Sequence, residues 1–561
     1  MIFGGSGGSA VERARAGSER PGGAAPHPQV SKLALDRAPE LLAPLLSDRD
    51  LAIRAEVVTG LFRYRFLLWL RSSGKLPSPL PLPVLERMLP LARDRDLEVR
   101  RALAYGFVRF RDERALGTVT ALSGDADEWT RLYSVQALAR IADPSAADAI
   151  VERLSDPSPR VRRAAVLAAA AVGRAEAAAP LRDDPDLHVR AAVAGVLSVA
   201  ADLPGGDVPG WLRTLAGDRS TEVRSAAVAS LAGRLKEGAY DDLRTALRDP
   251  SEYVRAAAVG ALASLPAAER ASLLAVVLGD TALAVRCAVV GLLAGEPGPD
   301  AFARIEAELS SDQVDVRGAA IAALARRKEP AALDLAWGAF CDSPGMSLTA
   351  LRETAVETFA AFDSEKSDGH LREALGDPSY PVAMAAYRVL ASRGAPGVTP
   401  PEETITLSPH RDLAVPEYPV LTLVTTKGPI TMVLFRDLAP VHVANAVGLV
   451  REGFFDGKTW LRVVPNFVIQ GGAPSPLGSE GQEWLLRAEV NRARFGRGAV
   501  GMSRGDLFNS GDSQFFVDHV PAAHLDGQYT RFGQVVSGLS TLDRIEAGDL
   551  ILRAWVGWHW R

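Results

Sequence analysis

The stretch DPSEYVRAAAVGAL, residues 249–262, recurs in close copies along the first two thirds of the chain. Each copy has an Asp, an Arg six residues later, and then small or branched apolar residues. Further copies are DPSPRVRRAAVLAA from Asp156, DRSTEVRSAAVASL from Asp218 and DTALAVRCAVVGLL from Asp280. The aligned arginines, most often 31 residues apart, are Arg54, Arg100, Arg131, Arg162, Arg190, Arg224, Arg255, Arg286, Arg317 and Arg352. Such a period predicts stacked units, none of which buries its apolar face alone.

Each unit is predicted to hold two short helices. Asp156, Asp249 and Asp377 are each followed by proline, which favours Asp as the N-cap and proline as the first helical residue. The copy that starts at Asp377 has Ala383 where the arginine would stand. Loss of the repeated residue is typical of a terminal, capping repeat.

This pattern resembles the short bacterial HEAT-like repeat. The resemblance implies that Asp and Arg of neighbouring repeats form a ladder along the array. An anion-binding stripe of arginines is the alternative. We expect an all-α solenoid of about eleven units over residues 31–392.

Composition limits the possible functions. A chain of 561 residues is too long for one hydrophobic core. Its net charge of −5 argues against a nucleic-acid partner, which requires a basic surplus. Cys287 and Cys341 supply neither a disulfide framework nor a zinc pattern. The sequence contains no run of about 18 apolar residues, so no membrane span is predicted.

Residues 1–30 are rich in Gly, Ser, Pro and Arg, and we expect a disordered tail there. No apolar core of a signal peptide is visible in it. This favours a cytoplasmic location, although a mis-assigned start could conceal an export signal and make the periplasm possible.

The helical period stops near residue 392. Residues 393–415 contain several prolines, which predicts a semi-rigid linker. From Pro419 the sequence VLTLVTTKGPITMVLF alternates, and it predicts two strands joined around Lys427–Gly428. Short strands in a Gly- and Phe-rich segment are typical of a closed β-barrel.

Three segments of this last part stand out: FFDGKTWLRVVPNFVIQGGAP from Phe454, GAVGMSRGDLFNSGDSQFFV from Gly498 and HLDGQYTRFGQV from His524. Together they resemble the cyclophilin family over residues 416–561. The resemblance implies an eight-stranded barrel that isomerises X-Pro bonds of protein or peptide clients without a cofactor or metal. The alternative is a non-catalytic module that binds proline-containing peptides within a scaffold protein.

The reaction explains which residues are needed. Rotation about a peptide bond has a barrier of ~18–20 kcal/mol, while the cis and trans forms of X-Pro differ by only about 0.5–1 kcal/mol. A catalyst must therefore favour the twisted amide, whose nitrogen has become basic. A positive hydrogen-bond donor aimed at that nitrogen stabilises the transition state selectively.

The resemblance implies roles residue by residue. Arg462 is the expected donor to the prolyl nitrogen, Phe467 part of the proline pocket, and Gln470 the residue that orients Arg462 and binds a substrate carbonyl. Ser503 and Arg504 are expected in a strand that pairs with the bound peptide. The remaining substrate-binding residues are Val468, Gln514, Phe516, His524, Leu525 and Tyr529.

Some residues depart from the family pattern. Leu461 replaces a common His, His524 a common Trp and Tyr529 a common His, and the first two predict weak cyclosporin binding. Gly501–Gly505 also fits the G-x-S-x-G elbow of hydrolases, but that motif requires a following helix, and a loop and strand are expected here. His519 and His524 have no acidic or Cys partner at helical spacing, so no metal site is predicted.

Overall fold

The computed structural model describes residues 38–71, 80–200 and 206–557. The tail predicted at residues 1–30 lies outside them. The chain forms two compact units, Met1–Pro180 and Leu181–Arg561, and each is described by itself. Among the described residues, no helix has both the length and the apolar character needed to cross a membrane.

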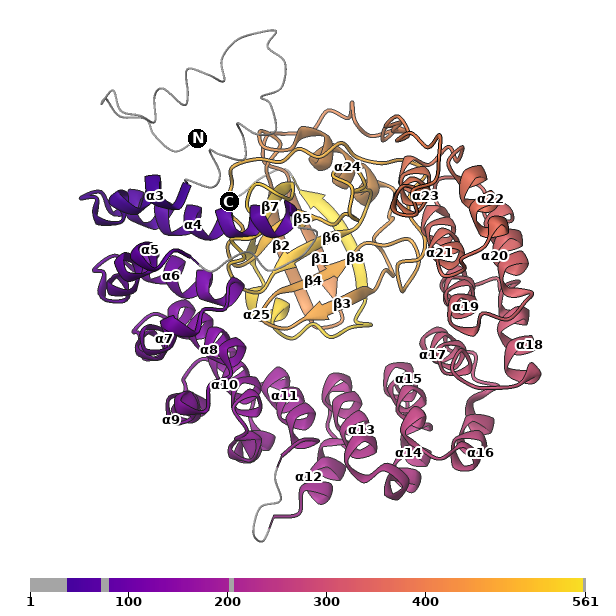
Figure 1. Cartoon of the computed structure of the whole chain (residues 1–561), viewed down its shortest axis with the longest axis horizontal. Helices are drawn as coiled ribbons and strands as arrows, with labels where there is room; N and C mark the ends of the chain where they lie inside the picture. Colours follow the sequence, from indigo (N-terminus) through magenta and orange to yellow (C-terminus); the bar gives the residue numbers. More distant parts are fainter. Residues whose placement is uncertain (1–37, 72–79, 201–205, 558–561) are drawn as a thin grey trace. The chain divides into compact units, whose positions relative to one another are not determined.

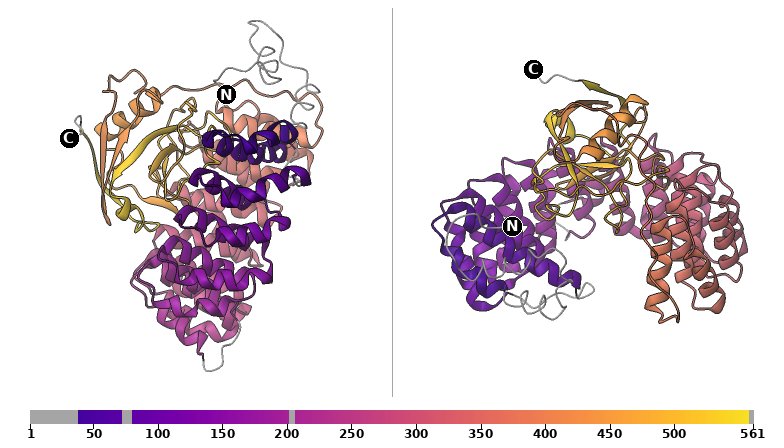
Figure 2. Two further views of the ribbon diagram at one scale, coloured as in Figure 1. Left: turned by 90° about the vertical axis from the view of Figure 1, so that its left-hand side faces the viewer. Right: turned by 90° about the horizontal axis from the view of Figure 1, so that it is seen from above.

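The first unit consists of helices that stack pair on pair (Figures 1 and 2). Consecutive arginine-bearing helices pack on each other, α4 on α6, α6 on α8 and α8 on α10. The helices are α3 (Ala38–Leu42), α4 (Leu51–Arg71), α5 (Leu82–Met88), α6 (Leu97–Arg109), α7 (Leu116–Leu122), α8 (Glu128–Ile141), α9 (Ala147–Glu152) and α10 (Pro159–Ala171).

The second unit continues the repeats, with every second helix from α11 to α23 packed on the next in the series. The helices are α11 (Leu187–Leu197), α12 (Val208–Leu215), α13 (Thr221–Leu235), α14 (Tyr240–Ala246), α15 (Glu252–Ala261), α16 (Ala267–Val277), α17 (Leu283–Leu293), α18 (Pro299–Glu308), α19 (Val314–Arg327), α20 (Ala332–Cys341), α21 (Thr349–Ala360), α22 (Glu365–Ala374) and α23 (Tyr380–Ser392). Each aligned arginine lies in a helix of its own, and Ala383 lies in α23. The predicted helical repeats are therefore confirmed.

The Asp–Arg ladder is present in both units. Arg255 donates from Nε to Asp280 of the next repeat at 2.7 Å, and from Nη1 to the carbonyl of Asp249 in its own repeat at 2.8 Å. The same pairing links Arg54–Asp94, Arg100–Asp125, Arg131–Asp156, Arg190–Asp218, Arg224–Asp249 and Arg352–Asp377. At these positions the guanidinium groups bind aspartates of neighbouring repeats, which favours the ladder over the anion-binding stripe.

The predicted helix caps are wrong by two positions. The N-caps are Ser158, Ser251 and Ser379, not the aspartates that precede them. Asp156 instead accepts the amide of Ser158 at 2.9 Å and the guanidinium of Arg131. The carboxylate that would have capped the helix is thus engaged in the ladder with the arginine of the preceding repeat.

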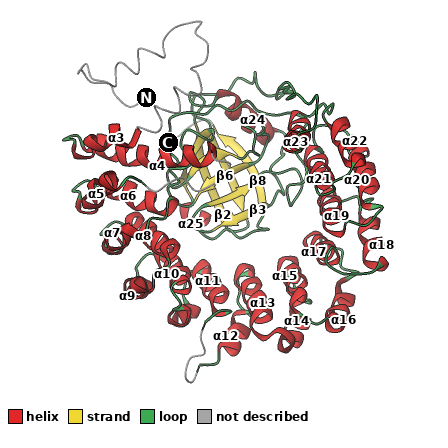
Figure 3. Cartoon of the chain, in the orientation of Figure 1, coloured by secondary structure: helices red, strands yellow, loops and turns green. Residues whose placement is uncertain are grey.

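The C-terminal part of the second unit is a curled eight-stranded sheet (Figure 3). Its antiparallel strands run in the order β3-β4-β6-β5-β7-β2-β1-β8. They are β1 (Val420–Thr425), β2 (Gly428–Leu434), β3 (Trp460–Val464), β4 (Val468–Gly471), β5 (Ala499–Met502), β6 (Phe515–Asp518), β7 (Arg531–Ser537) and β8 (Ile551–Gly557), with helices α24 (Pro440–Arg451) and α25 (Leu539–Leu542). The β1–β2 hairpin confirms the strands predicted from the alternating pattern.

The two ends of the sheet meet where β3 begins and just before β8 begins, which closes the barrel there. Trp460 of β3 donates its amide to the carbonyl of Asp549 at 2.8 Å and accepts the amide of Gly548 at 2.9 Å. The Trp460 side chain is fully buried in the barrel core. Closure removes the exposed edges that an open sheet would present.

The segment before the barrel has fixed contacts with it. Leu485 donates its amide to the carbonyl of Thr406 at 3.0 Å, and buried Ser408 donates to Asn445 of α24 at 2.7 Å. A Cβ on Gly448 of α24 would lie 2.3 Å from the ring of His410. The second half of the expected linker is thus packed on the barrel.

Candidate active site

One face of strands β3, β4 and β6 gathers the residues singled out from the sequence. Arg462 pairs with Gln470, and Gln470 pairs with Phe516, so the three lie side by side across the sheet. Because side chains alternate along a strand, Val468 shares this face with Gln470, whereas Ile469 between them lies in the barrel core. The positions of Arg462, Val468, Gln470 and Phe516 follow from period-two alternation.

An apolar cluster forms the floor of this face. Its buried members are Val468, Phe495, Ala499, Phe516, Ala522 and Leu525, with Phe467 and Tyr529 packed against them. The ring of Phe467 lies 5.3 Å from that of His524, and Phe516 lies 5.7 Å from both Phe495 and Tyr529. The predicted pocket residues are therefore brought together, and His524 flanks Phe467.

Gly501 of β5 leaves the room that the aromatic floor needs. It stands opposite Phe516 in the sheet, and a Cβ there would lie 2.3 Å from the Phe516 ring and 2.7 Å from that of Phe495. Any side chain at this position would displace both rings. The glycine of the hydrolase-like motif thus has a packing role.

The strand that leads into that motif, β5, is not followed by a helix. β5 ends at Met502, and the chain continues through turns to β6. Ser503 and Arg504 therefore lie just beyond β5, which corrects their placement in a strand. The predicted loop and strand after the motif are confirmed.

Gln470 stands at the centre of a polar group beside the pocket. Its Nε2 donates to Ser503 Oγ at 2.9 Å and to Gln514 Oε1 at 3.1 Å. These bonds fix the side-chain amide next to Arg462, its cross-strand neighbour. Gln470 and Arg462 are cross-strand neighbours. Because the guanidinium is a donor only, a hydrogen bond between them would run from Arg462 to Gln470 Oε1, and the orientation of Arg462 by Gln470 stays a prediction.

Asp512 holds the backbone next to these polar side chains. Its carboxylate accepts the amides of Ser513 at 2.6 Å and Gln514 at 3.1 Å on one oxygen, and of Gln482 at 3.1 Å on the other. Burial is the main influence on this carboxyl and raises its pKa, although the three amides oppose the rise. Asp512 sets the direction of the chain that carries Gln514.

Arg462 and Arg504 differ in their surroundings. Arg462 is exposed, and within the described ranges its guanidinium has no ion-pair partner, so its hydrogen-bond donors are available to a ligand. Arg504 lies with its guanidinium carbon 4.5 Å from the ring centres of Tyr529 and Phe508, and it donates to the carbonyl of Gln528 at 3.3 Å. Arg504 thus packs beside the pocket, whereas Arg462 faces outward.

Two buried titratable groups, Asp518 at the end of β6 and His519 just after it, have no bond to this polar group. Burial raises the pKa of Asp518 well above its usual value; Arg531 opposes this rise and Asp526 adds to it. Burial also lowers the pKa of His519 to about 4, and nearby His188 contributes. His519 Nε2 lies 3.1 Å from the carbonyl of Leu542, so this histidine has a structural partner.

Phe495 and Asp512 were not singled out from the sequence. Phe495 comes from the long segment between β4 and β5, where no periodic pattern marks a buried position. Asp512 lies in the turn before β6, where an acidic residue is ordinary. The only sequence signal for Asp512 was its place two residues before Gln514.

Comparison with known proteins identifies the family of the C-terminal part and the type of the repeats. Residues 420–555 match the family model "Cyclophilin type peptidyl-prolyl cis-trans isomerase/CLD", and residues 117–198 and 208–282 match HEAT repeats. A peptidyl-prolyl cis-trans isomerase of Helicobacter pylori strain J99 is 42% identical over 134 residues, which cover 23% of this chain and 82% of that protein. One from Synechococcus elongatus is 40% identical, covering 23% and 90%. Isomerase B of Bacillus subtilis is also 40% identical, covering 21% and 83%. The chain therefore belongs to the cyclophilin-type peptidyl-prolyl cis-trans isomerases, here joined to HEAT repeats.

Proposed function

We propose that the chain isomerises X-Pro bonds at the face formed by Arg462, Gln470 and the apolar cluster around Phe516. The observation that carries the proposal is the register of Arg462, Gln470 and Phe516 across three neighbouring strands. This register supports the proposal, because it brings a charged donor, a fixed amide and an apolar floor side by side.

Each part of this face has a task in the reaction. The Arg462 guanidinium, charged at any relevant pH, donates to the prolyl nitrogen as the amide twists and that nitrogen becomes basic. Phe467, Phe516 and Leu525 hold the proline ring while the preceding part of the peptide rotates. Gln470, held by Ser503 and Gln514, binds a carbonyl of the substrate.

The remaining predicted residues contribute to the substrate groove. Val468 lies on the pocket floor, and Tyr529 closes one side of it beneath Arg504. His524 flanks Phe467. The backbone beyond β5, at Ser503 and Arg504, pairs with the bound peptide.

The test is substitution of Arg462 in the full chain. Loss of one donor that acts mainly in the transition state lowers kcat by roughly 100-fold to 1,000-fold in other enzymes. Arg462→Ala is expected to fall in that range in exchange measurements on an Ala-Pro tetrapeptide. Arg553→Ala, at an exposed arginine of β8, is the matched control and should retain wild-type rates. Equal rates for wild type and Arg462→Ala would contradict the proposal.

We further propose that the repeats bind protein clients and so raise the efficiency of the barrel on them. Stacked repeats present a long continuous surface, which suits extended partners. Residues 403–561 alone provide the comparison, because they lack the repeats. On a protein whose refolding is limited by proline, the full chain should act at a lower KM, and equal KM values on several such clients would refute client binding.

A further inference from the structure

The segment between β4 and β5 touches both the repeats and the active site. Near its start, Ser475 donates to Asp315 of α19 at 3.0 Å, and Ser479 donates its amide to the same carboxylate at 2.9 Å. A third donor, the amide of Leu477, lies 3.2 Å away. Asp315 and Ser475 are both buried. A buried carboxylate with three donors fixes the path of residues 475–479.

A second contact holds the next part of the segment on the repeats. Glu483 accepts the amide of Met346 at 3.0 Å and the hydroxyl of Ser347 at 2.5 Å. Gly481 donates its amide to the carbonyl of Ser347 at 2.8 Å. The loop that receives Glu483 is itself fixed by the ladder, because Arg352 donates to the carbonyl of Gly345 at 2.6 Å.

The same segment then reaches the polar group of the site. Between Gly481 and Glu483, the amide of Gln482 donates to Asp512, whose other oxygen holds the amide of Gln514. Gln514 in turn accepts from Gln470. Hydrogen bonds at Asp315, Asp512 and Gln514, joined by the chain of residues 475–482, thus link α19 to Gln470.

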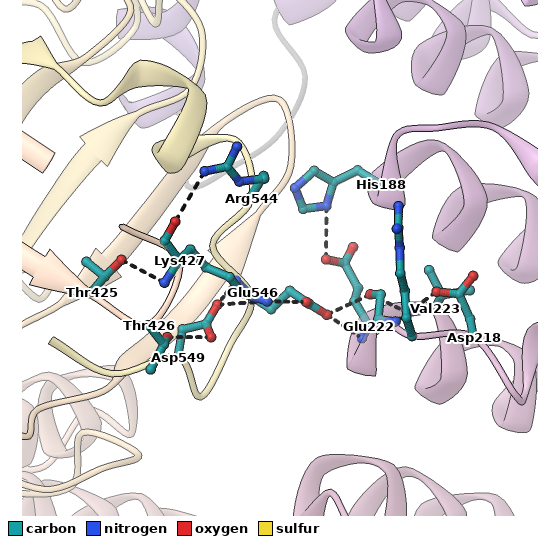
Figure 4. Close-up of polar contacts among 12 residues, drawn as sticks. His188, Asp218, Glu222, Val223, Thr425, Thr426, Lys427, Arg544, Glu546 and Asp549 are labelled. Carbon is teal, nitrogen blue, oxygen red and sulfur yellow. Dashed lines mark hydrogen bonds and ion pairs between the residues drawn. The ribbon is translucent and has the colours of Figure 1, made fainter. Parts of the chain in front are cut away.

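The barrel also meets the repeats at a second place, around Glu546 (Figure 4). Glu546 accepts the hydroxyl of Ser220 at 2.6 Å and the amide of Glu222 at 2.9 Å, at the start of α13, and Lys427 at 2.8 Å. Close by, His188 lies 2.9 Å from Glu222 and 3.0 Å from the carbonyl of Asp543. None of these bonds joins residues 475–482 or Asp512. A variant at this second contact can therefore serve as the control for a variant at the first contact.

We propose that Asp315 of the repeats is a positioning residue for the isomerase, acting through residues 475–482 and Asp512 on Gln514 and Gln470. The inference rests on the proposed roles of Gln470 and Gln514 in binding substrate. Its physical basis is preorganisation: a side chain held at its working position before substrate binds loses no energy to reorientation in the transition state. The HEAT repeats are then a structural part of the active site.

The test compares Asp315→Asn with Glu546→Gln in the full chain. Both changes remove the charge of a buried carboxylate that joins the barrel to the repeats, but only Asp315 is linked to the polar group. Asp315→Asn is expected to lower kcat on an Ala-Pro tetrapeptide about tenfold and to change KM less than twofold. Glu546→Gln should stay within twofold of wild type in both.

Ser475→Ala tests the same link from the barrel side and leaves α19 unchanged, so it serves also if Asp315→Asn fails to fold. It should lower kcat similarly, and the double variant should be no slower than the slower single one, because both remove the same link. Hydrogen exchange of residues 475–482 and 511–516 should rise in Asp315→Asn and Ser475→Ala only.

Wild-type kcat in folded Asp315→Asn and Ser475→Ala would overturn the inference, as would an equal loss in Glu546→Gln. An unchanged rate in Arg462→Ala would refute the proposed active site itself. The two failures are therefore distinguishable.

Discussion

Asp518 is a carboxyl group in surroundings that do not favour a charge. It lies at the end of β6 opposite Val468, fully buried, and neither carboxylate oxygen has a hydrogen-bond partner among the described residues. An ionised carboxylate without partners is costly to bury, so the group becomes neutral instead. The raised pKa of Asp518 reflects the free-energy cost of burying the charged form.

Asp518→Asn is therefore expected to stabilise the protein at pH 7. Below the unfolded pKa, about 3.9, Asp518 is protonated in both states and costs nothing. Above it the unfolded chain ionises while the folded protein resists, so stability is lost as pH rises toward the raised folded pKa. Asn has no such loss. We expect a gain of about 1–3 kcal/mol in the free energy of unfolding by urea at pH 7, shrinking toward pH 4. A variant less stable than wild type at pH 7 would show that the carboxylate has a partner.

At the scale of elements, the ladder joins neighbouring repeats by partly buried ion pairs. Burial alone would raise the pKa of Asp280, but the hydrogen bonds from Arg255 and from the amide of Ala282 outweigh it and hold the pKa below its usual value. Asp280 therefore stabilises the fold above its unfolded pKa, and this contribution disappears as pH falls.

Asp280→Asn should destabilise the second unit by about 1–3 kcal/mol at pH 7, because it leaves Arg255 without its charged partner. The matched control is Asp334→Asn in the same array, since Asp334 pairs with Lys366 at the surface, with side chains 60% and 55% exposed. Exposed pairs contribute about 0–1 kcal/mol. Urea unfolding at pH 7 measures the free energy of unfolding of both variants. Equal losses would mean that the partly buried ladder pair stabilises the array no more than the exposed pair does.

Some features of these elements could be predicted from the sequence, and others could not. The repeats were predictable because most units use the same Asp and Arg, so the ladder repeats in the sequence. Arg462, Gln470 and Phe516 were found through resemblance, and strand alternation then explains why they share a face. Phe495, the serine caps and the Asp315–Ser475 contact were missed, because each depends on residues that meet only in the folded chain.

At the scale of the whole molecule, the second unit combines repeats and barrel. Two of its contacts with the barrel, at Ser220–Glu546 and Asp315–Ser475, lie on repeats separated by α15 and α17. Between them, a Cβ on Gly548 of the barrel would meet the Tyr253 ring at 2.2 Å. The number of repeats between α13 and α19 must therefore match the spacing of Glu546 and Ser475 on the barrel.

Deletion of whole repeats tests this match. Removing Asp249–Gly279 takes out one 31-residue unit and places Arg224 next to Asp280, so the ladder continues and the array should remain folded. Ser220 and Asp315, however, would then be one repeat too close for both barrel contacts to form. We expect kcat on a tetrapeptide to fall about tenfold, as in Asp315→Asn.

Removing Asp125–Ser155 from the first unit is the matched control, since it also takes out 31 residues and places Arg100 next to Asp156. It leaves both barrel contacts on their own repeats, so kcat should stay at the wild-type value. Circular dichroism would verify that both deletion variants keep their helices, because a nearest-neighbour array loses only the removed unit. A deletion of fifteen residues from Asp125 would break the ladder register and should lower the melting temperature far more. If the two whole-repeat deletions gave the same kcat, the spacing of the repeats would have no bearing on the isomerase, and the repeats would act on clients alone.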